Sequence, residues 1–266
     1  MKKTTILDFS RKKASGEKIT VLTASDYPMA RIIDASGIDA ILVGDSLGMV
    51  VLGYESTVKV TMREMIHHAK AVTRGVQRAF VIADMPFMSY QASDESAIRN
   101  AGRFVKEAGC DAVKIELGGE MSQRAKAIVS AGIPVVGHIG LTPQSSSKIG
   151  GYRVQGRDSQ KAEEIILDAG RLEEAGCFAL ILECVPLDLA RKITAKIGIP
   201  TIGIGAGPYC DGQVLVTHDI IGYFDKFLPK FVKQYAKVGD VIAEAVDAFK
   251  KETETGVFPD EDHSFS

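Results

Sequence analysis

The chain has 266 residues, of which 45% are hydrophobic and 25% are charged, and its formal net charge is −2. This balance is ordinary for a globular enzyme and gives no electrostatic reason to expect nucleic acid or an anionic membrane as a partner. Apolar runs stay below the roughly 18 residues of a membrane span, and charges between Asp8 and Lys13 interrupt what would be the apolar core of a signal peptide. We therefore expect a cytoplasmic protein. Its four cysteines form no CxxC pair, which predicts reduced thiols rather than a disulfide scaffold or a thiolate metal site.

Short apolar runs alternate with helical patterns along the chain. A recurring phrase places a glycine at the end of a helix and an apolar run soon after it, as in Ser36-Gly37-Ile38 and Ala108-Gly109-Cys110. This rhythm is typical of βα units and a parallel sheet. The expected strands are 19–23, 40–43, 80–83, 112–116, 134–138, 179–183, 200–204 and 214–217. Eight of them favour a (β/α)₈ TIM barrel over an open sheet.

Helix starts can be read at three places between these strands. Thr61-Met62-Arg63-Glu64 is a capping box that predicts a helix to about Arg74. Ser93 or Asp94 caps the next helix, and Asp158 or Ser159 a later one. The link 205–213 is too short for a full helix. A helical segment at about 227–254 ends the chain, and without a dividing linker we expect one domain over 1–266.

Two long loops, 44–60 and 139–158, follow strands. In a barrel both lie on the face formed by the carboxyl ends of the strands, where such folds hold their active sites. The composition of the second loop is that of a flexible segment, which makes it a candidate lid.

Acidic residues follow several of the predicted strands. Asp45 and Asp84 come directly after the second and third strands, and Glu116 ends the fourth. Neighbouring strands lie about 5 Å apart, so these three carboxylates can approach a common point, where a cation must offset their repulsion. All-oxygen ligands favour Mg²⁺. Asp26 follows the first strand, but its place before Tyr27-Pro28 favours a helix cap.

Lys114 lies two residues before Glu116, so both side chains point to the same side of their strand. If that side is the interior, the lysine lies deeper and the glutamate nearer the opening. Lys114 can stabilise an oxyanion or a substrate carboxylate, form a Schiff base in a metal-free aldolase, or make a structural ion pair with Glu116.

Glu183 ends the sixth strand, across the barrel from the three acids. A partly desolvated glutamate is a competent general base, although it can also bond to a neighbouring loop. His138 ends the fifth strand and is equally compatible with substrate binding and with packing. Gly203-Ile204-Gly205-Ala206-Gly207 is compatible with a phosphate cradle or with close backbone approach.

Five segments around these strand ends, taken together, are specific enough to indicate a protein family. They are Val43-Gly44-Asp45-Ser46-Leu47-Gly48, Ala83-Asp84-Met85-Pro86-Phe87, Val113-Lys114-Ile115-Glu116, Gly137-His138-Ile139-Gly140-Leu141-Thr142-Pro143-Gln144 and Leu182-Glu183. They resemble the ketopantoate hydroxymethyltransferase family, and the likeness extends from Lys3 to Phe258-Pro259-Asp260.

The resemblance implies a (β/α)₈ barrel that assembles into a homodecamer. It implies one-carbon transfer from 5,10-methylenetetrahydrofolate, the cosubstrate, to 3-methyl-2-oxobutanoate, giving 2-dehydropantoate at the start of pantothenate biosynthesis. It also implies one Mg²⁺ per subunit. The site residues that it implies are Asp45, Asp84 and Glu116 for the metal, Asp45, Ser46, Asp84 and Lys114 for the substrate, and Glu183 as the proton acceptor.

Two other functions stay open on the sequence. One is a Mg-dependent 2-oxo-acid lyase or mutase of the phosphoenolpyruvate mutase and isocitrate lyase kind, from which folate-dependent turnover would distinguish the transferase. The other is a non-catalytic barrel that acts as a scaffold, which the convergent charges disfavour.

Overall fold

A computed structural model of the chain describes every residue except 1, 117–120, 146–150, 152 and 225. It divides into two compact units, Met1–Val216 and Thr217–Ser266. In the first unit eight parallel strands pair in sequence order and close into a barrel, which confirms the predicted fold. The strands are β1 (Ile19–Thr23), β2 (Ala40–Val43), β3 (Phe80–Asp84), β4 (Ala112–Glu116), β5 (Val135–Gly140), β6 (Ala179–Glu183), β7 (Thr201–Ile204) and β8 (Gly212–Leu215). That the whole chain forms one domain stays a prediction.

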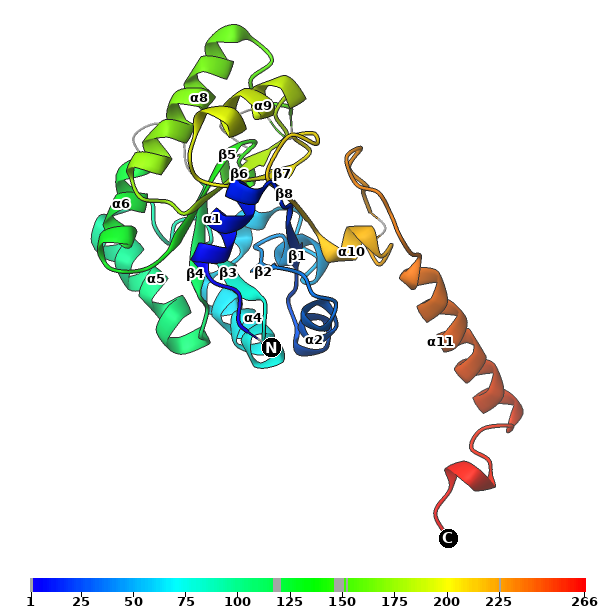
Figure 1. Cartoon of the computed structure of the whole chain (residues 1–266). Coiled ribbons are helices and arrows are strands. Elements are labelled where there is room, and N and C mark those ends of the chain that lie inside the picture. Colours follow the sequence, from blue (N-terminus) through cyan, green and yellow to red (C-terminus); the bar gives the residue numbers. More distant parts are fainter. Residues whose placement is uncertain (1, 117–120, 146–150, 152, 225) are drawn as a thin grey trace. The chain divides into compact units, whose positions relative to one another are not determined.

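Helices surround this barrel (Figure 1). Those of the first unit are α1 (Ile6–Ser15), α2 (Tyr27–Ala35), α3 (Leu47–Val50), η1 (Thr57–Lys59), α4 (Met62–Gly75), α5 (Asp94–Ala108), α6 (Ser122–Ser130), η3 (Pro143–Ser145), α8 (Ser159–Glu174) and α9 (Leu187–Lys196). Thr61, Ser93 and Asp158 cap α4, α5 and α8, as their spacing predicts. Residues 205–211, between β7 and β8, contain no helix, also as expected.

The barrel interior changes in character along the strands. Near their amino ends the inward-facing residues are apolar and form one packed cluster. Because side chains alternate between the two faces of a strand, every second residue along a strand faces the barrel interior, and these residues form a row. On β3 the row runs from Ile82 to Asp84, and on β4 from Ala112 to Lys114 and Glu116. The strands therefore carry an apolar floor and, at their carboxyl ends, a charged opening, which we call the barrel mouth.

Helix α1 closes the amino end of the barrel. Its Phe9 is 1% exposed and packs edge-on against Phe80 and Phe178, with ring centroids 5.5 and 5.3 Å away. Burying an aromatic side chain of this size stabilises a fold by about 1.5–3 kcal/mol. This plug leaves the mouth as the face on which a site can form.

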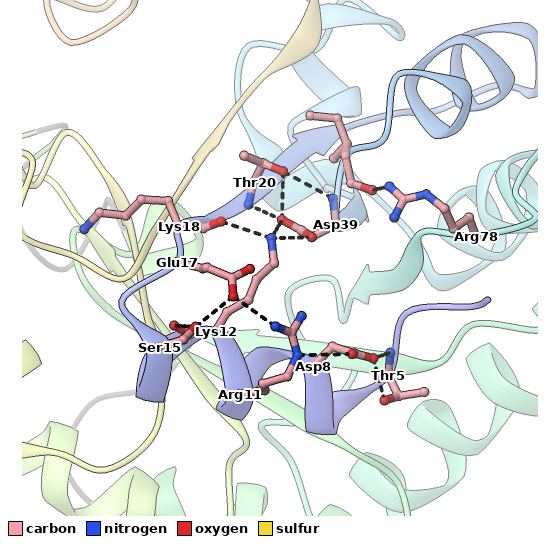
Figure 2. A network of polar contacts seen from close by, with 11 residues as sticks. Thr5, Asp8, Arg11, Lys12, Ser15, Glu17, Lys18, Thr20, Asp39 and Arg78 are labelled. Atoms are coloured by element: carbon pink, nitrogen blue, oxygen red, sulfur yellow. Dashed lines mark hydrogen bonds and ion pairs between the residues drawn. The ribbon is translucent and has the colours of Figure 1, made fainter. Parts of the chain in front are cut away.

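Aspartates that precede strands tie α1 and the N-terminal segment to the barrel floor. Figure 2 shows Asp39, just before β2, where it accepts from the Thr20 N–H at 2.8 Å and lies 2.7 Å from the Lys12 ammonium. Two further sets repeat this pattern, Asp111 with Val81 and Lys3, and Asp211 with Thr201 and Lys13. These acids are matched by lysines and backbone donors, so they have a structural role.

The last strand lies earlier in the chain than predicted. It spans Gly212–Leu215 rather than 214–217, and Thr217 begins α10 (Thr217–Ile220). Gly212 approaches β1 so closely that a Cβ there would meet the carbonyl oxygen of Ile19 at 2.4 Å. Only glycine permits that approach, and a glycine at a strand start is easily taken for part of a loop.

The second unit contains α10, α11 (Val238–Thr255) and η4 (Glu261–His263). The expected helix start near 227 is wrong, because Pro229 disfavours a helical conformation for the residue before it. The N–H groups of Tyr235 and Val238 instead donate to Ile220 and Ile221. Every helix in the described part of the chain is too short or too polar to cross a lipid bilayer.

Candidate active site at the barrel mouth

Four charged side chains from β2, β3 and β4 meet at the barrel mouth. Asp45, Asp84, Lys114 and Glu116, here called the acid–lysine cluster, are each at most 7% exposed. Asp84 and Lys114 are register partners on adjacent strands, and the Lys114 Nζ lies 2.9 Å from Asp84 Oδ1 and 4.0 Å from Glu116 Oε1. Lys114 and Glu116 therefore lie on the same side of β4, as predicted, and that side faces the barrel interior. The partner that Lys114 contacts directly is Asp84 rather than Glu116.

Asp45 enters this cluster from the turn after β2. Its N–H donates to Asp84 Oδ2 at 3.0 Å, and its own Oδ2 accepts from the side-chain amide of Gln144 at 2.9 Å. A short helix, α3, follows Asp45 and Ser46. The half-buried Ser46 makes no side-chain capping bond to it. Asp45 thus faces the cluster, and Ser46 lies beside it at the mouth.

His138 links this cluster to the opposite side of the barrel. Its Nδ1 lies 3.5 Å from Glu116 Oε1, and its Nε2 lies 3.1 Å from Glu183 Oε2 on β6. Neither nitrogen has hydrogen-bond geometry toward its carboxylate, so each of the two contacts is an interaction between charged groups. Burial and the nearby Lys114 oppose the imidazolium, but the two carboxylates outweigh them and raise the pKa of His138 to about 9. His138 is thus part of the polar site, and Glu183, its side chain 16% exposed, lies at the site's wetter edge.

The acid–lysine cluster has more negative than positive charge. Burial, and then the nearby carboxylates of Asp84 and Glu116, raise the pKa of Asp45 well above its ordinary value. Burial also opposes the carboxylate of Glu116, but contacts with His138, Lys114 and the Gln144 N–H lower its pKa overall. Asp45 is therefore the acid whose charge is poorly compensated.

Lys114 is held in its charged form. Burial alone would favour the neutral amine, but Asp84, Glu116 and Asp45 outweigh burial and raise the pKa of Lys114. A Schiff-base lysine needs a lowered pKa to be nucleophilic. The geometry therefore disfavours the metal-free aldolase and favours a fixed positive charge.

Sequence reasoning assigned no role to Gln144 or Tyr90, yet both lie at the centre of the site. Gln144 is 4% exposed on η3, and the fully buried Tyr90 hydroxyl lies 2.8 Å from its side-chain oxygen and 3.0 Å from the Glu116 carbonyl. Tyr90 lies in a loop and Gln144 in a three-residue 3₁₀ helix, and segments this short show no periodicity that predicts burial.

The donor set has the right chemistry for a hard divalent cation but is not arranged as a ligand set. Three buried carboxylates lie with one lysine, and burial together with the Asp84 and Glu116 carboxylates raises the pKa of Asp45. Within the described residues, however, no group of three or more His, Cys, Asp or Glu side chains is placed to hold a metal ion. Ligation of Mg²⁺ by Asp45, Asp84 and Glu116 stays a prediction.

Other expected features fall outside this cluster. Asp26 caps α2, accepting from the Met29 N–H at 2.8 Å, as predicted. A Cβ at Gly207 would lie 2.6 Å from that of Leu187, which supports the close-approach interpretation of the glycine-rich segment. All four cysteines are free. The candidate lid at 139–158 includes 146–150 and 152, which lie outside the described residues.

The sequence model of one protein family, described as ketopantoate hydroxymethyltransferase, matches residues 3–261. The chain belongs to the ketopantoate hydroxymethyltransferase family. The family inferred from the five motifs is confirmed, and with it an enzyme of the hydroxymethyltransferase class.

Relatives within the ketopantoate hydroxymethyltransferase family match almost end to end. The 3-methyl-2-oxobutanoate hydroxymethyltransferase of Moorella thermoacetica is 60% identical over 253 residues, covering 95% of this chain and 94% of its own. That of Thermoanaerobacter sp. (strain X514) is 58% identical, with 99% and 96% covered.

Solved structures with similar folds include a phosphonopyruvate hydrolase complexed with oxalate and Mg²⁺. It has a TM-score of 0.66 and 12% identity, with 98% of this chain and 93% of that chain covered. A 2,3-dimethylmalate lyase of the phosphoenolpyruvate mutase/isocitrate lyase superfamily has a TM-score of 0.61 and 17% identity, with 98% and 92% covered. At these identities the likeness shows the barrel fold alone, so the lyase or mutase alternative gains no support in chemistry.

Proposed function

We propose that this chain transfers a hydroxymethyl group from 5,10-methylenetetrahydrofolate to 3-methyl-2-oxobutanoate, giving 2-dehydropantoate for pantothenate biosynthesis. Relatives at 58–60% identity bear the corresponding name. The observation that carries the proposal is that the barrel mouth has two chemically different sides. A charged Lys114 lies among acids on one side, and Glu183 lies on β6, the strand opposite β2. Carbanion chemistry next to a carbonyl needs both a positive charge and a base.

The acid–lysine cluster is the proposed site of one Mg²⁺, with Asp45, Asp84 and Glu116 as ligands. The excess of carboxylates over lysine there supports a cation. When bound, the ion would act as a Lewis acid toward the keto acid's carbonyl oxygen.

Each remaining residue has a role that its surroundings support. Ser46 and Lys114, together with Asp45 and Asp84, would contact the 2-oxo acid, and the Lys114 ammonium would offset negative charge that develops on the substrate. Glu183 would remove the proton on C3, and its contact with His138 at 3.1 Å would hold its side chain at the mouth. The C3 carbon would then bond to the methylene carbon of the folate, and the bonds from that carbon to the two folate nitrogens would break. Water would supply the hydroxyl group, and the proton from C3 and one from water would pass to the folate nitrogens, releasing tetrahydrofolate.

The test is exchange of the C3 hydrogen of 3-methyl-2-oxobutanoate with deuterium, measured by NMR with and without Mg²⁺ and folate. We expect Glu183→Gln to lower both exchange and product formation by about 10²–10⁴-fold, the usual contribution of a general base. Binding of the keto acid should change little, because the acid–lysine cluster is intact.

Glu174→Gln is a matched control, since Glu174 is an exposed residue at the end of α8. It should exchange at the wild-type rate. Wild-type exchange rates in Glu183→Gln would remove Glu183 as the base, and turnover without folate would favour the lyase or mutase alternative.

We further propose a cytoplasmic homo-oligomer, a decamer by resemblance, that binds neither nucleic acid nor membrane. The free cysteines support a reducing compartment. Assembly is supported by α11, on which Ile242, Val246 and Phe249 are 42%, 59% and 58% exposed. Apolar residues at this spacing form one face of a helix, and such a face is normally covered.

A further inference from the structure

Gln144 is a buried side chain with every polar atom engaged. Its Nε2 donates to Asp45 Oδ2 at 2.9 Å and to the Met85 carbonyl at 3.0 Å, and its Oε1 accepts from the Tyr90 hydroxyl at 2.8 Å. Its backbone N–H donates to Glu116 Oε2 at 2.9 Å. One residue therefore contacts two of the three acids in the cluster.

The partners of Gln144 determine which way its amide points. The Asp45 carboxylate and the Met85 carbonyl can only accept hydrogen bonds, so the atom facing them must be the NH₂ group. The oxygen then faces Tyr90. A side chain without the NH₂ donor or without the oxygen acceptor would leave a buried partner without its hydrogen bond, so this position requires an amide side chain.

We propose that Gln144 is a positioning residue, which holds Asp45 through its side chain and Glu116 through its backbone and so keeps both carboxylates within the proposed cation site. This inference rests on the proposed function. Asp45 is 4% exposed and lies beside Asp84, so its carboxylate needs a hydrogen-bond donor in place of water. Gln144 supplies that donor from a different element, η3, and so connects the loop after β5 to the turn after β2.

Tyr90 extends the same connection. Its hydroxyl accepts from the Glu116 N–H at 3.1 Å and contacts the Gln144 side chain, so it fixes the end of β4 relative to the amide. Hydrogen-bond partners of metal-binding side chains orient the ligands, and losing one typically costs about 10–100-fold in metal affinity.

The test is Mn²⁺ affinity, measured by electron paramagnetic resonance on the full chain without substrate. Gln144→Met keeps the length of the side chain and the backbone N–H but removes the donor to Asp45. We expect its Kd for Mn²⁺ to rise by about 10–100-fold. Gln160→Met, at an exposed position on α8, is the matched control and should bind as the wild type does.

The outcomes separate this inference from the function on which it rests. A wild type that binds Mn²⁺ and a folded Gln144→Met whose Kd rises by less than about threefold would overturn the positioning role alone. A wild type that binds no Mn²⁺ would overturn the proposed metal site and the inference with it. If Gln144→Met does not fold, Tyr90→Phe carries the test, since it removes the hydroxyl that holds Gln144 and Glu116. An unchanged Kd in that variant would equally overturn the inference.

Discussion

Asp45 shows how a site residue can weaken the fold that contains it. Its carboxylate is buried beside two other acids, and its pKa is raised well above the ordinary value by burial and by those neighbours. An acid with a raised pKa in the folded state opposes folding once it ionises. We infer that the metal-free protein is less stable at neutral pH because of the arrangement that would attract a cation.

We expect Asp45→Asn to stabilise the metal-free protein at pH 7 by on the order of 1 kcal/mol. Because the folded pKa of Asp45 is raised, the wild type loses stability as pH rises from the unfolded value of about 3.9 through the folded one. The stability that Asp45→Asn gains over the wild type should therefore be complete above this pH window and absent below pH 4. Denaturant unfolding in chelator across pH 4–8 measures it.

Asp26→Asn is the control for this comparison. Asparagine caps helices as well as aspartate does, so its effect should stay within about 0.5 kcal/mol at every pH. A lower stability of Asp45→Asn at pH 7 would show that the carboxylate is compensated in the folded protein.

The cluster could be predicted from the sequence where a strand, or the turn directly after it, carries the residue. Lys114 and Glu116 lie on one side of β4, as expected, because alternation along a strand requires it. The partner of Lys114 depends on strand register, which brings Asp84 beside it and which no pattern in the chain specifies. Gln144 and Tyr90 reach the site from irregular segments, so their contacts arise only from the folded geometry.

At the level of elements, position relative to a strand separates structural acids from those of the proposed site. Aspartates before strands, such as Asp39, are neutralised by a lysine and a backbone N–H at the barrel floor. Acids after strands share Lys114 at the mouth. The strands themselves were predictable, because buried β runs have a clear apolar signature. β8 and the short α3 were not, since a close-approach glycine and a four-residue helix lack such a signature.

Gly140 positions Glu183 across the β5–β6 pairing. It has φ of 96°, and a Cβ there would lie 2.2 Å from the Glu183 carbonyl oxygen and 2.8 Å from Val185 Cγ1. The Gly140→Ala change must therefore displace the backbone that carries the proposed base. We expect kcat for C3 exchange to fall by about 10²-fold, the usual cost of a displacement near 1 Å.

Gly132→Ala separates displacement from backbone strain. Gly132 has φ of 85°, but a Cβ there would meet nothing within 4 Å. The Gly132→Ala change should lower the free energy of unfolding by about 1 kcal/mol and leave the exchange rate unchanged. If Gly140→Ala also keeps its exchange rate, the position of Glu183 does not depend on this contact.

At the level of the whole molecule, the proposed site and the exposed helix belong to different units. Every predicted site residue lies in Met1–Val216, whereas α11 lies in Thr217–Ser266 and buries none of its residues. Helices in proteins gain most of their stability from packing of an apolar face. We therefore expect other copies of the chain to cover it.

The apolar stripe of α11, formed by Ile242, Val246 and Phe249, can be tested as the contact between copies by replacing Ile242 and Phe249 with lysine. Lysine is a good helix former, so the helix should persist while the stripe becomes charged and the assembly dissociates into smaller species, as measured by size-exclusion chromatography with light scattering. Glu244→Lys is the control, because at 100° per residue it lies on the opposite face of α11, and it should keep the wild-type mass. An unchanged mass in the Ile242→Lys/Phe249→Lys variant would show that the stripe is not the contact between copies.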